Sequence, residues 1–212
     1  MGSPMMGQVG NRNCLWHGSG LTGIMPSLLP FLLRFLAILI FVGSTLGAHA
    51  EPAVGVVSKA VNPAEIGSKT AVVGASVQMN DRLRTGANGR LQITFRDQSV
   101  LTLGEKADVV VDRYVYNPSK SKGELVLKAT QGAFRFAGGK LEDMNEKKVI
   151  VSTPYAAMAV RGTDFWAGPI YGQYGVLLLK GKVGVSNQGG AVTLASPGMG
   201  TDIPLRHRKT RR

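Results

Sequence analysis

Short runs of alternating apolar and polar residues dominate the chain from residue 51 onward. In the run GRLQITF, for example, Leu91, Ile93 and Phe95 fall on one face of an extended strand. Alternation with a period of two residues indicates half-buried β-strands, and no apolar stripe of helical period interrupts it. Glycine, asparagine and aspartate separate the runs, as is typical of turns. The pattern therefore predicts an all-β fold.

Several runs can be placed as individual strands. GRLQITF and SVLTLG, joined by RDQS, form a hairpin candidate, and Asn88-Gly89 in TGANGR is a turn signal. Further strands are expected in DVVVDRYVY, ELVLKA, GAFRFA, KVIVST and YGVLLLKGKVGVS, with GGKLEDMNEK as one long polar connection. A weak repeat, GRLQI, GAFRF and GKVGV, suggests stacked short antiparallel strands in a twisted β-sandwich or short solenoid-like domain. Chance similarity among strands explains the repeat equally well.

The N-terminal part has the features of an export signal. An apolar core from Phe35 to Val42 follows Arg34 and leads to Ala48-His49-Ala50, an A-x-A site before Glu51. We therefore expect a signal peptide at residues 25–50 that is cleaved between Ala50 and Glu51, with an uncleaved anchor as the alternative. Residues 1–24 form an uninformative extension, 51–205 the predicted domain and 206–212 a basic tail. After cleavage no stable transmembrane segment is expected.

The charge balance narrows the range of partners. The formal net charge is +12, and residues 51–205 hold 18 basic against 13 acidic side chains. For an exported protein this favours anionic envelope components or acidic proteins over nucleic acid. The tail RHRKTRR is expected to be a solvated terminus, with binding to polyanions as the alternative.

Histidine and cysteine usage argues against catalysis. Cys14, His17 and His49 precede the predicted cleavage site, and His207 lies in the tail. The predicted mature domain therefore has no thiolate nucleophile, no triad histidine and no zinc site of the usual kind, so no catalytic, cofactor-binding or metal-binding residues are expected. The acids Asp108 and Asp112, and the loop acids Glu142, Asp143 and Glu146, are interpreted as solvated side chains.

The segment TPYAAMAVRGTDFW places a charge beside small apolar residues. In the structural interpretation, which we favour, Arg161 forms an internal ion pair with Asp97 or Asp81, and Gly162 permits a bulge. In a regular strand Arg161 would share its face with Thr163, and Asp164 would point away. In the functional interpretation, Arg161 and Thr163 grip an acidic partner.

Aromatic residues gather around the same segment. Tyr155, Trp166, Tyr171 and Tyr174 form either a partner-binding surface or part of the core. The loop-like GPIYGQYG favours exposure of the tyrosines.

Several blocks of the chain resemble a known family. In VVGASVQMNDRLRTGANGRLQITFRDQSVLTLGEKADVVVDRY the motif residues are Asn80, Asp81, Thr85, Gly86, Phe95, Asp97, Ser99 and Leu101. The later blocks are QGAFRF, VIVSTPYAAMAVRGTDFW and LLLKGKVGVSNQGGAVTLASPG. Together they resemble the FecR-like periplasmic domain over nearly all of residues 53–200.

The resemblance implies an extracytoplasmic β-domain used in cell-surface signalling, where relatives pass a signal from an outer-membrane receptor to a cytoplasmic sigma factor. Because an export signal stands where those relatives have a cytoplasmic segment and a membrane span, we expect a stand-alone exported domain. It would act as a binding or sensing module in the periplasm, at the surface or outside a Gram-negative cell. Its partner would be an envelope or outer-membrane protein or an anionic envelope component. The alternative is a structural envelope protein or adhesin-like β-scaffold without a signalling role.

Overall fold

The computed structural model describes residues 52–204 of the 212-residue chain. The predicted extension, the signal peptide with its Ala50 and Glu51 cleavage site, and the basic tail 206–212 lie outside the described residues. Within residues 52–204 no helix has the length and apolar character needed to cross a membrane.

The described residues form fifteen β-strands and two short 3-10 turns, which confirms the all-β prediction. The strands of the first half are β1 (Gly55–Val61), β2 (Ala64–Ile66), β3 (Lys69–Thr70), β4 (Ser76–Val77), β5 (Arg82–Thr85), β6 (Arg90–Phe95), β7 (Val100–Leu103) and β8 (Asp108–Asn117). The second half contains η1 (Pro118–Lys120), β9 (Lys122–Gln131), β10 (Phe134–Ala137), η2 (Lys140–Asp143), β11 (Glu146–Ser152), β12 (Ala157–Ile170), β13 (Gln173–Asn187), β14 (Gly190–Leu194) and β15 (Gly200–Pro204).

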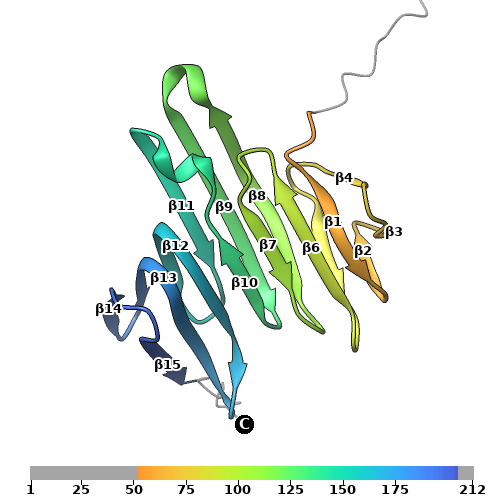
Figure 1. Cartoon of the computed structure of the whole chain (residues 1–212). Coiled ribbons are helices and arrows are strands. Elements are labelled where there is room, and N and C mark those ends of the chain that lie inside the picture. The colour runs from red at the N-terminus through yellow and green to blue at the C-terminus, as the bar shows by residue number, and fades with distance from the viewer. Residues whose placement is uncertain (1–51, 205–212) are drawn as a thin grey trace, which may run out of the picture. The chain divides into compact units, whose positions relative to one another are not determined.

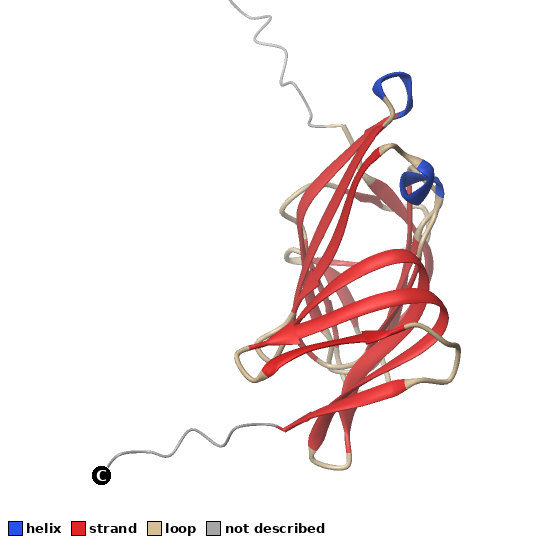
Figure 2. Ribbon diagram, turned by 90° about the vertical axis from the view of Figure 1, so that its left-hand side faces the viewer, coloured by secondary structure: helices blue, strands red, loops and turns tan. Residues whose placement is uncertain are grey.

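All the strands belong to one mixed sheet in the order β3-β2-β5-β8-β9-β11-β12-β10-β7-β6-β1-β4, and β13 continues from β12 to pair with β14 and β15. Strands β9 and β11 pair in parallel. The sheet curls around its apolar side into a half-barrel (Figures 1 and 2). The expected sandwich or solenoid of stacked antiparallel strands is thus replaced by one continuous curled sheet. Alternation within a strand decides which side is buried, but it does not decide which strands pair.

The curl brings the inner sides of distant strands together. Phe95 of β6 stacks on Tyr114 of β8, with ring centroids 5.6 Å apart, although these strands are far apart in the sheet order. Between the neighbouring strands β10 and β12, Phe134 meets Phe165 edge to face at 5.8 Å. All four side chains are buried. Burial of each such side chain stabilises the fold by about 1.5–3 kcal/mol, so the core holds the two sides of the curl together.

Strand β7 explains the weak sequence repeat. The predicted hairpin is confirmed, because β6 and β7 pair antiparallel, and β10 pairs with the other edge of β7. Leu91 of β6 and Phe134 of β10 both lie opposite Leu103. GRLQI and GAFRF therefore look alike because they flank one strand in the same register, whereas GKVGV lies within β13.

Candidate functional site

Strand β12 carries the sequence motif Arg161-Gly162-Thr163 on a β-bulge. The cross-strand partners change from Arg161 and Lys182 to Asp164 and Lys180, so two residues of β12 face one residue of β13. Gly162 has φ +62°, in the left-handed region that glycine adopts without strain. The bulge expected at Gly162 is therefore confirmed, and the strand is not regular.

The bulge reverses which residues of β12 face the core. Before it, Met158 and Val160 are buried, and after it Thr163 and Phe165 are buried. Arg161, which regular alternation would have placed on the side of Thr163, is exposed. Its charge therefore lies on the outer side of the sheet.

The hydroxyl of Thr163 closes the bulge from inside. It donates a hydrogen bond to the backbone oxygen of Lys182 at 2.6 Å and accepts one from the backbone N–H of Arg161 at 3.0 Å. Only 3% of the Thr163 surface is exposed. This hydroxyl is thus a structural element of the sheet and is not presented to a ligand.

The carboxylate of Asp97 is buried, and its hydrogen-bond donors are groups other than Arg161. Its carboxylate accepts hydrogen bonds from the Ser99 hydroxyl at 2.7 Å, the Tyr114 hydroxyl at 3.1 Å and the backbone N–H of Leu141 at 3.3 Å. Burial and the neighbouring Asp97 carboxylate raise the pKa of Tyr114, so this hydroxyl remains a donor. The acid of the first-half motif is therefore tied to the η2 segment.

The predicted ion pair of Arg161 with Asp97 or Asp81 is wrong for the described part of the chain. Asp97 faces the interior, whereas the bulge turns Arg161 outward. The carboxylate of Asp81 instead accepts the backbone N–H of Gln78 at 2.7 Å. The prediction failed because it assumed that β12 is a regular strand, in which Arg161 and Thr163 share a face.

Glu142 of η2, which the sequence interpretation had placed among solvated loop acids, contacts the bulge of β12. Glu142 is only 8% exposed, and its Oε1 accepts the backbone N–H of Thr163 at 3.4 Å. The backbone N–H of Gly138 donates to the oxygen of Thr163 at 2.9 Å. Both contacts occupy the edge of β12 between its pairing with β11 and its pairing with β10, where no strand supplies partners to Thr163.

The carboxylate of Glu142 has a hydrogen-bond partner for only one of its two oxygens within the described residues. Its Oε2 is buried and has no hydrogen-bond partner within the described residues. Burial raises the pKa of Glu142, while the Thr163 N–H and the charge of Lys147 act in the opposite direction. The one feature of the sequence that could have indicated the burial of Glu142 is the Gly138-Gly139 pair just before it. Gly138 leaves room for the carboxylate, because a Cβ at this position would lie 2.0 Å from Glu142 Oε1.

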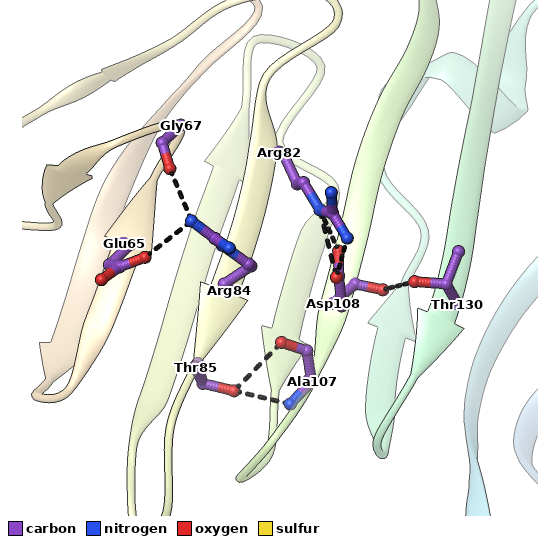
Figure 3. Close-up of polar contacts among 8 residues, drawn as sticks. All are labelled: Glu65, Gly67, Arg82, Arg84, Thr85, Ala107, Asp108 and Thr130. Atoms are coloured by element: carbon purple, nitrogen blue, oxygen red, sulfur yellow. Dashed lines mark hydrogen bonds and ion pairs between the residues drawn. The ribbon is translucent and has the colours of Figure 1, made fainter.

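The remaining acids of the sequence analysis are half-buried in ion pairs, as Asp108 and Asp112 are, or exposed. Asp108 forms an ion pair with Arg82 at 2.5 Å, and Asp112 pairs with Lys128 (Figure 3 shows the first pair). Asp143 and Glu146 are exposed. Asp108 and Asp112 therefore each form an ion pair with a different basic side chain. Residues 52–204 contain no cluster of acids, histidines or cysteines arranged to hold a metal ion.

Thr85, the last residue of β5, holds the neighbouring backbone through its hydroxyl, and Figure 3 shows its contacts with Ala107. The Thr85 hydroxyl donates to the backbone oxygen of Gly104 at 2.6 Å and accepts the N–H of Ala107 at 2.9 Å. Like Thr163, Thr85 is buried. The threonines of both motifs therefore fix backbone and do not face solvent.

The four aromatic residues of the predicted surface differ in exposure, and they do not form one surface. Tyr174 is buried, and its ring lies 4.9 Å from that of the half-buried Tyr155. Tyr171 is 99% exposed in the β12–β13 turn, and Trp166 is half-buried on the outer side of β12. Exposure is confirmed for Tyr171 and wrong for Tyr174, because the alternation of β13 turns Tyr174 inward.

The outer side of the β12–β13 hairpin collects charged and apolar groups that we call the hairpin face. Arg161 lies directly opposite Lys182, and Trp166 directly opposite Leu177. Leu177 and Leu179 are each 38% exposed. The hairpin face comprises Arg161, Asp164, Trp166, Leu177, Leu179 and Lys182.

Asp164 on this face is already neutralised. Arg135 of β10 donates to both of its carboxylate oxygens, at 2.9 and 2.6 Å. The one acid of the hairpin face is therefore already paired with a cation other than Arg161 or Lys182. The sequence analysis did not identify Lys182 and Leu177 as candidate site residues. Only the register of β12 and β13 shows that they lie opposite Arg161 and Trp166.

The chain matches a known protein family. The model of the family described as FecR protein matches residues 81–184, and the chain contains a FecR domain over that range. The match includes Asp97, Glu142, the Arg161-Gly162-Thr163 bulge and Lys182. FecR domains are typically periplasmic and generally non-enzymatic.

Two crystal structures of a candidate anti-sigma factor from Parabacteroides distasonis ATCC 8503, at 2.50 and 1.65 Å resolution, are similar to part of the chain. Sequence identity is 18% and 19%, with TM-scores of 0.44 and 0.43. In each case the similarity covers 57% of this chain and 58% of that chain. No curated protein matches.

Proposed function

We propose that the protein is an exported, non-enzymatic binding module of cell-surface signalling, and that the hairpin face receives an acidic segment of an envelope protein. The FecR domain over residues 81–184 supports a signalling role. The A-x-A site before Glu51 supports export to the periplasm or cell surface.

The observation that carries the proposal is the pairing of Arg161 with Lys182. Two cations directly opposite each other on neighbouring strands repel, which destabilises the sheet. Neither side chain takes part in the ion pairs formed within residues 52–204. A carboxylate of a partner placed between them would relieve the repulsion, and the binding energy would then include that gain.

The apolar part of the hairpin face supplies the second requirement of a protein interface. Trp166 and its cross-strand partner Leu177 lie farther along the same hairpin than the charged pair, and Leu179 lies between the two pairs on β13. All three side chains are partly exposed. Tryptophan and arginine are the residue types most often found among interface hot spots. The combination favours a protein segment with both acidic and apolar side chains over a simple anion.

The test is capture of partners from an envelope extract with the full chain, followed by cross-linking and identification by mass spectrometry. We expect one dominant protein, whose capture falls with rising salt and is lost in Arg161→Glu and Lys182→Glu. Arg90→Glu is the matched control, because Arg90 is exposed on β6, lies opposite Val61 and forms no ion pair within the described residues. It should capture the partner normally.

Retained capture by the Arg161→Glu, Lys182→Glu double variant would refute the assignment of the hairpin face. Broad retention of envelope polysaccharide without a dominant protein would favour the alternative of a β-scaffold. Thermal melting of each variant checks that the fold is kept.

A further inference from the structure

A pocket of about 570 Å³ lies away from the charged pair, where three chain segments converge. The segments are the β11–β12 turn, the β13–β14 turn and the end of β15. Its lining residues are Pro154, Tyr155, Ala156, Ala157, Ser186, Asn187, Gln188, Gly189, Ile203 and Pro204. A volume of this size is in the range of small-ligand sites.

The walls of the pocket are held by local hydrogen bonds and do not depend on a ligand. In the β11–β12 turn the Thr153 hydroxyl accepts the backbone N–H of Ala156 at 3.0 Å, and the Thr153 N–H donates to the Ala156 oxygen at 2.9 Å. In the β13–β14 turn Asn187 Oδ1 accepts the N–H of Gly189 at 2.8 Å. The pocket is therefore preformed on its two turn sides.

Tyr155 supplies an aromatic wall. Its ring lies against the buried Tyr174, with centroids 4.9 Å apart and planes inclined by 36°. Tyr174 does not line the pocket, so it supports Tyr155 from the core. A ring fixed in this way offers a flat apolar platform at little entropic cost.

The polar groups of the pocket are neutral. Asn187 lines the pocket and uses its Oδ1 within the turn, so its Nδ2 protons are the donors left for a ligand. The side-chain amide of Gln188 forms no hydrogen bond within residues 52–204. None of the ten lining residues is charged. A second hollow of about 350 Å³ shares Ser186, Asn187, Gly189, Ile203 and Pro204 with the first and adds Asp202.

This lining selects among ligand classes. Phosphates and other anions need cations, and none of the described residues that line the pocket supplies one. A lipid chain needs a continuous apolar channel, whereas four of the ten lining residues (Tyr155, Ser186, Asn187 and Gln188) have side chains that can form hydrogen bonds. A neutral sugar fits, because each ring has an apolar C–H face that packs on an aromatic side chain and an edge of hydroxyls that pair with amides and carboxylates.

We propose that the two adjoining hollows form a binding site for a neutral oligosaccharide, with one sugar ring packed on Tyr155 and its hydroxyls paired with Asn187 and Gln188. The second hollow receives the next ring, where the Asp202 carboxylate accepts from a hydroxyl. The site is separate from the hairpin face and does not depend on the proposed protein partner.

The experiment is titration of the full ¹⁵N-labelled chain with chitotriose, cellotriose, maltotriose and mannotriose at millimolar concentrations, followed by backbone amide shifts. We expect saturable shifts confined to residues 153–157, 186–192 and 201–203 for at least one sugar. If all four sugars leave these amides unmoved, or if shifts occur elsewhere only, the proposal is refuted.

Two variants with matched controls separate binding from folding. Asn187→Asp keeps the acceptor for Gly189 but removes the Nδ2 donor, and should weaken binding about three- to tenfold. Asn117→Asp is its control, because Asn117 Oδ1 likewise accepts a backbone N–H, that of Lys120, outside the pocket. Unchanged affinity in Asn187→Asp would contradict the assigned contact.

Tyr155→Leu keeps an apolar contact to Tyr174 but removes the platform, and should weaken binding about tenfold or more. Tyr116→Leu is its control, because Tyr116 is also a half-buried tyrosine packed on the core, away from the pocket. Equal effects of the two tyrosine variants would mean that the loss reflects folding and would overturn the role of Tyr155.

Discussion

Glu142 accepts a hydrogen bond from the backbone N–H of Thr163 at 3.4 Å, at the point where β12 changes partner from β11 to β10. A side chain here replaces the carbonyl that a neighbouring strand would provide. Because Leu141, beside it, donates to Asp97, this segment joins the acid of the first-half motif to the threonine of the second. The contact also makes the stability of the fold sensitive to pH.

The first prediction concerns Glu142→Gln. Burial raises the pKa of Glu142 from its ordinary 4.5, so the folded state binds the proton more tightly than the unfolded state. The stabilisation is complete below the unfolded-state pKa and is lost as the pH rises through the folded-state value. The variant keeps the acceptor for Thr163 without a charge. Its free energy of unfolding minus that of the wild type should therefore increase as the pH rises above about 4.5, by at most about 1.4 kcal/mol per pH unit.

Urea unfolding of both proteins from pH 4 to 8 measures this difference, and titrating groups that do not interact with Glu142 cancel in the subtraction. A difference that is constant across this range would show that Glu142 titrates normally in the fold.

The second prediction compares two acids of the first-half motif. Asp97→Ala removes the acceptor of three donors in a buried site, and should lower the free energy of unfolding by about 3–5 kcal/mol. Asp81→Ala removes one partly exposed contact to Gln78 and should cost about 1 kcal/mol. Chemical denaturation of the two variants and the wild type measures both losses in the free energy of unfolding. Equal costs would contradict the junction described for Asp97.

The third prediction concerns the bulge. Gly162→Ala places a Cβ 3.7 Å from its nearest neighbour, Glu142 Oε2, which is ordinary van der Waals contact, so its cost is that of the left-handed backbone, about 1–2 kcal/mol. Gly184→Ala, in extended β13, meets nothing closer than 3.9 Å and should leave the melting temperature unchanged or raise it slightly. Calorimetry of both variants tests the assignment, which fails if Gly162→Ala melts with the wild type.

The fourth prediction concerns the charged pair. Lys182→Glu replaces the repulsion from Arg161 by attraction, and should raise the melting temperature at low salt and lose this gain at high salt. The same variant should lose the acidic partner. Arg90→Glu, opposite the neutral Val61, should show no comparable gain. A melting temperature of Lys182→Glu that is unchanged at low salt would mean that the two cations do not interact.

The sequence anticipated features that arise within a strand or a turn. Leu91, Ile93 and Phe95 were placed on one face, and they are buried. The hairpin of β6 and β7 and the bulge at Gly162 were likewise anticipated. These features depend on neighbouring residues alone, because side chains alternate across a strand and only glycine adopts a positive φ freely.

The partners of the buried acids were decided by the tertiary structure. Asp97 and Leu141 are 44 positions apart, and only the curl of the sheet brings them together. Glu142 looked like a solvated loop acid because its burial depends on a gap between β10 and β11 that no local pattern reveals. One bulge residue moved Arg161 to the outside and opposite Lys182. By itself the sequence determined strand faces, turns and the glycine bulge, since these follow from local backbone geometry. The fold alone decided which strands pair and which charges are buried or exposed, since these depend on contacts between distant segments.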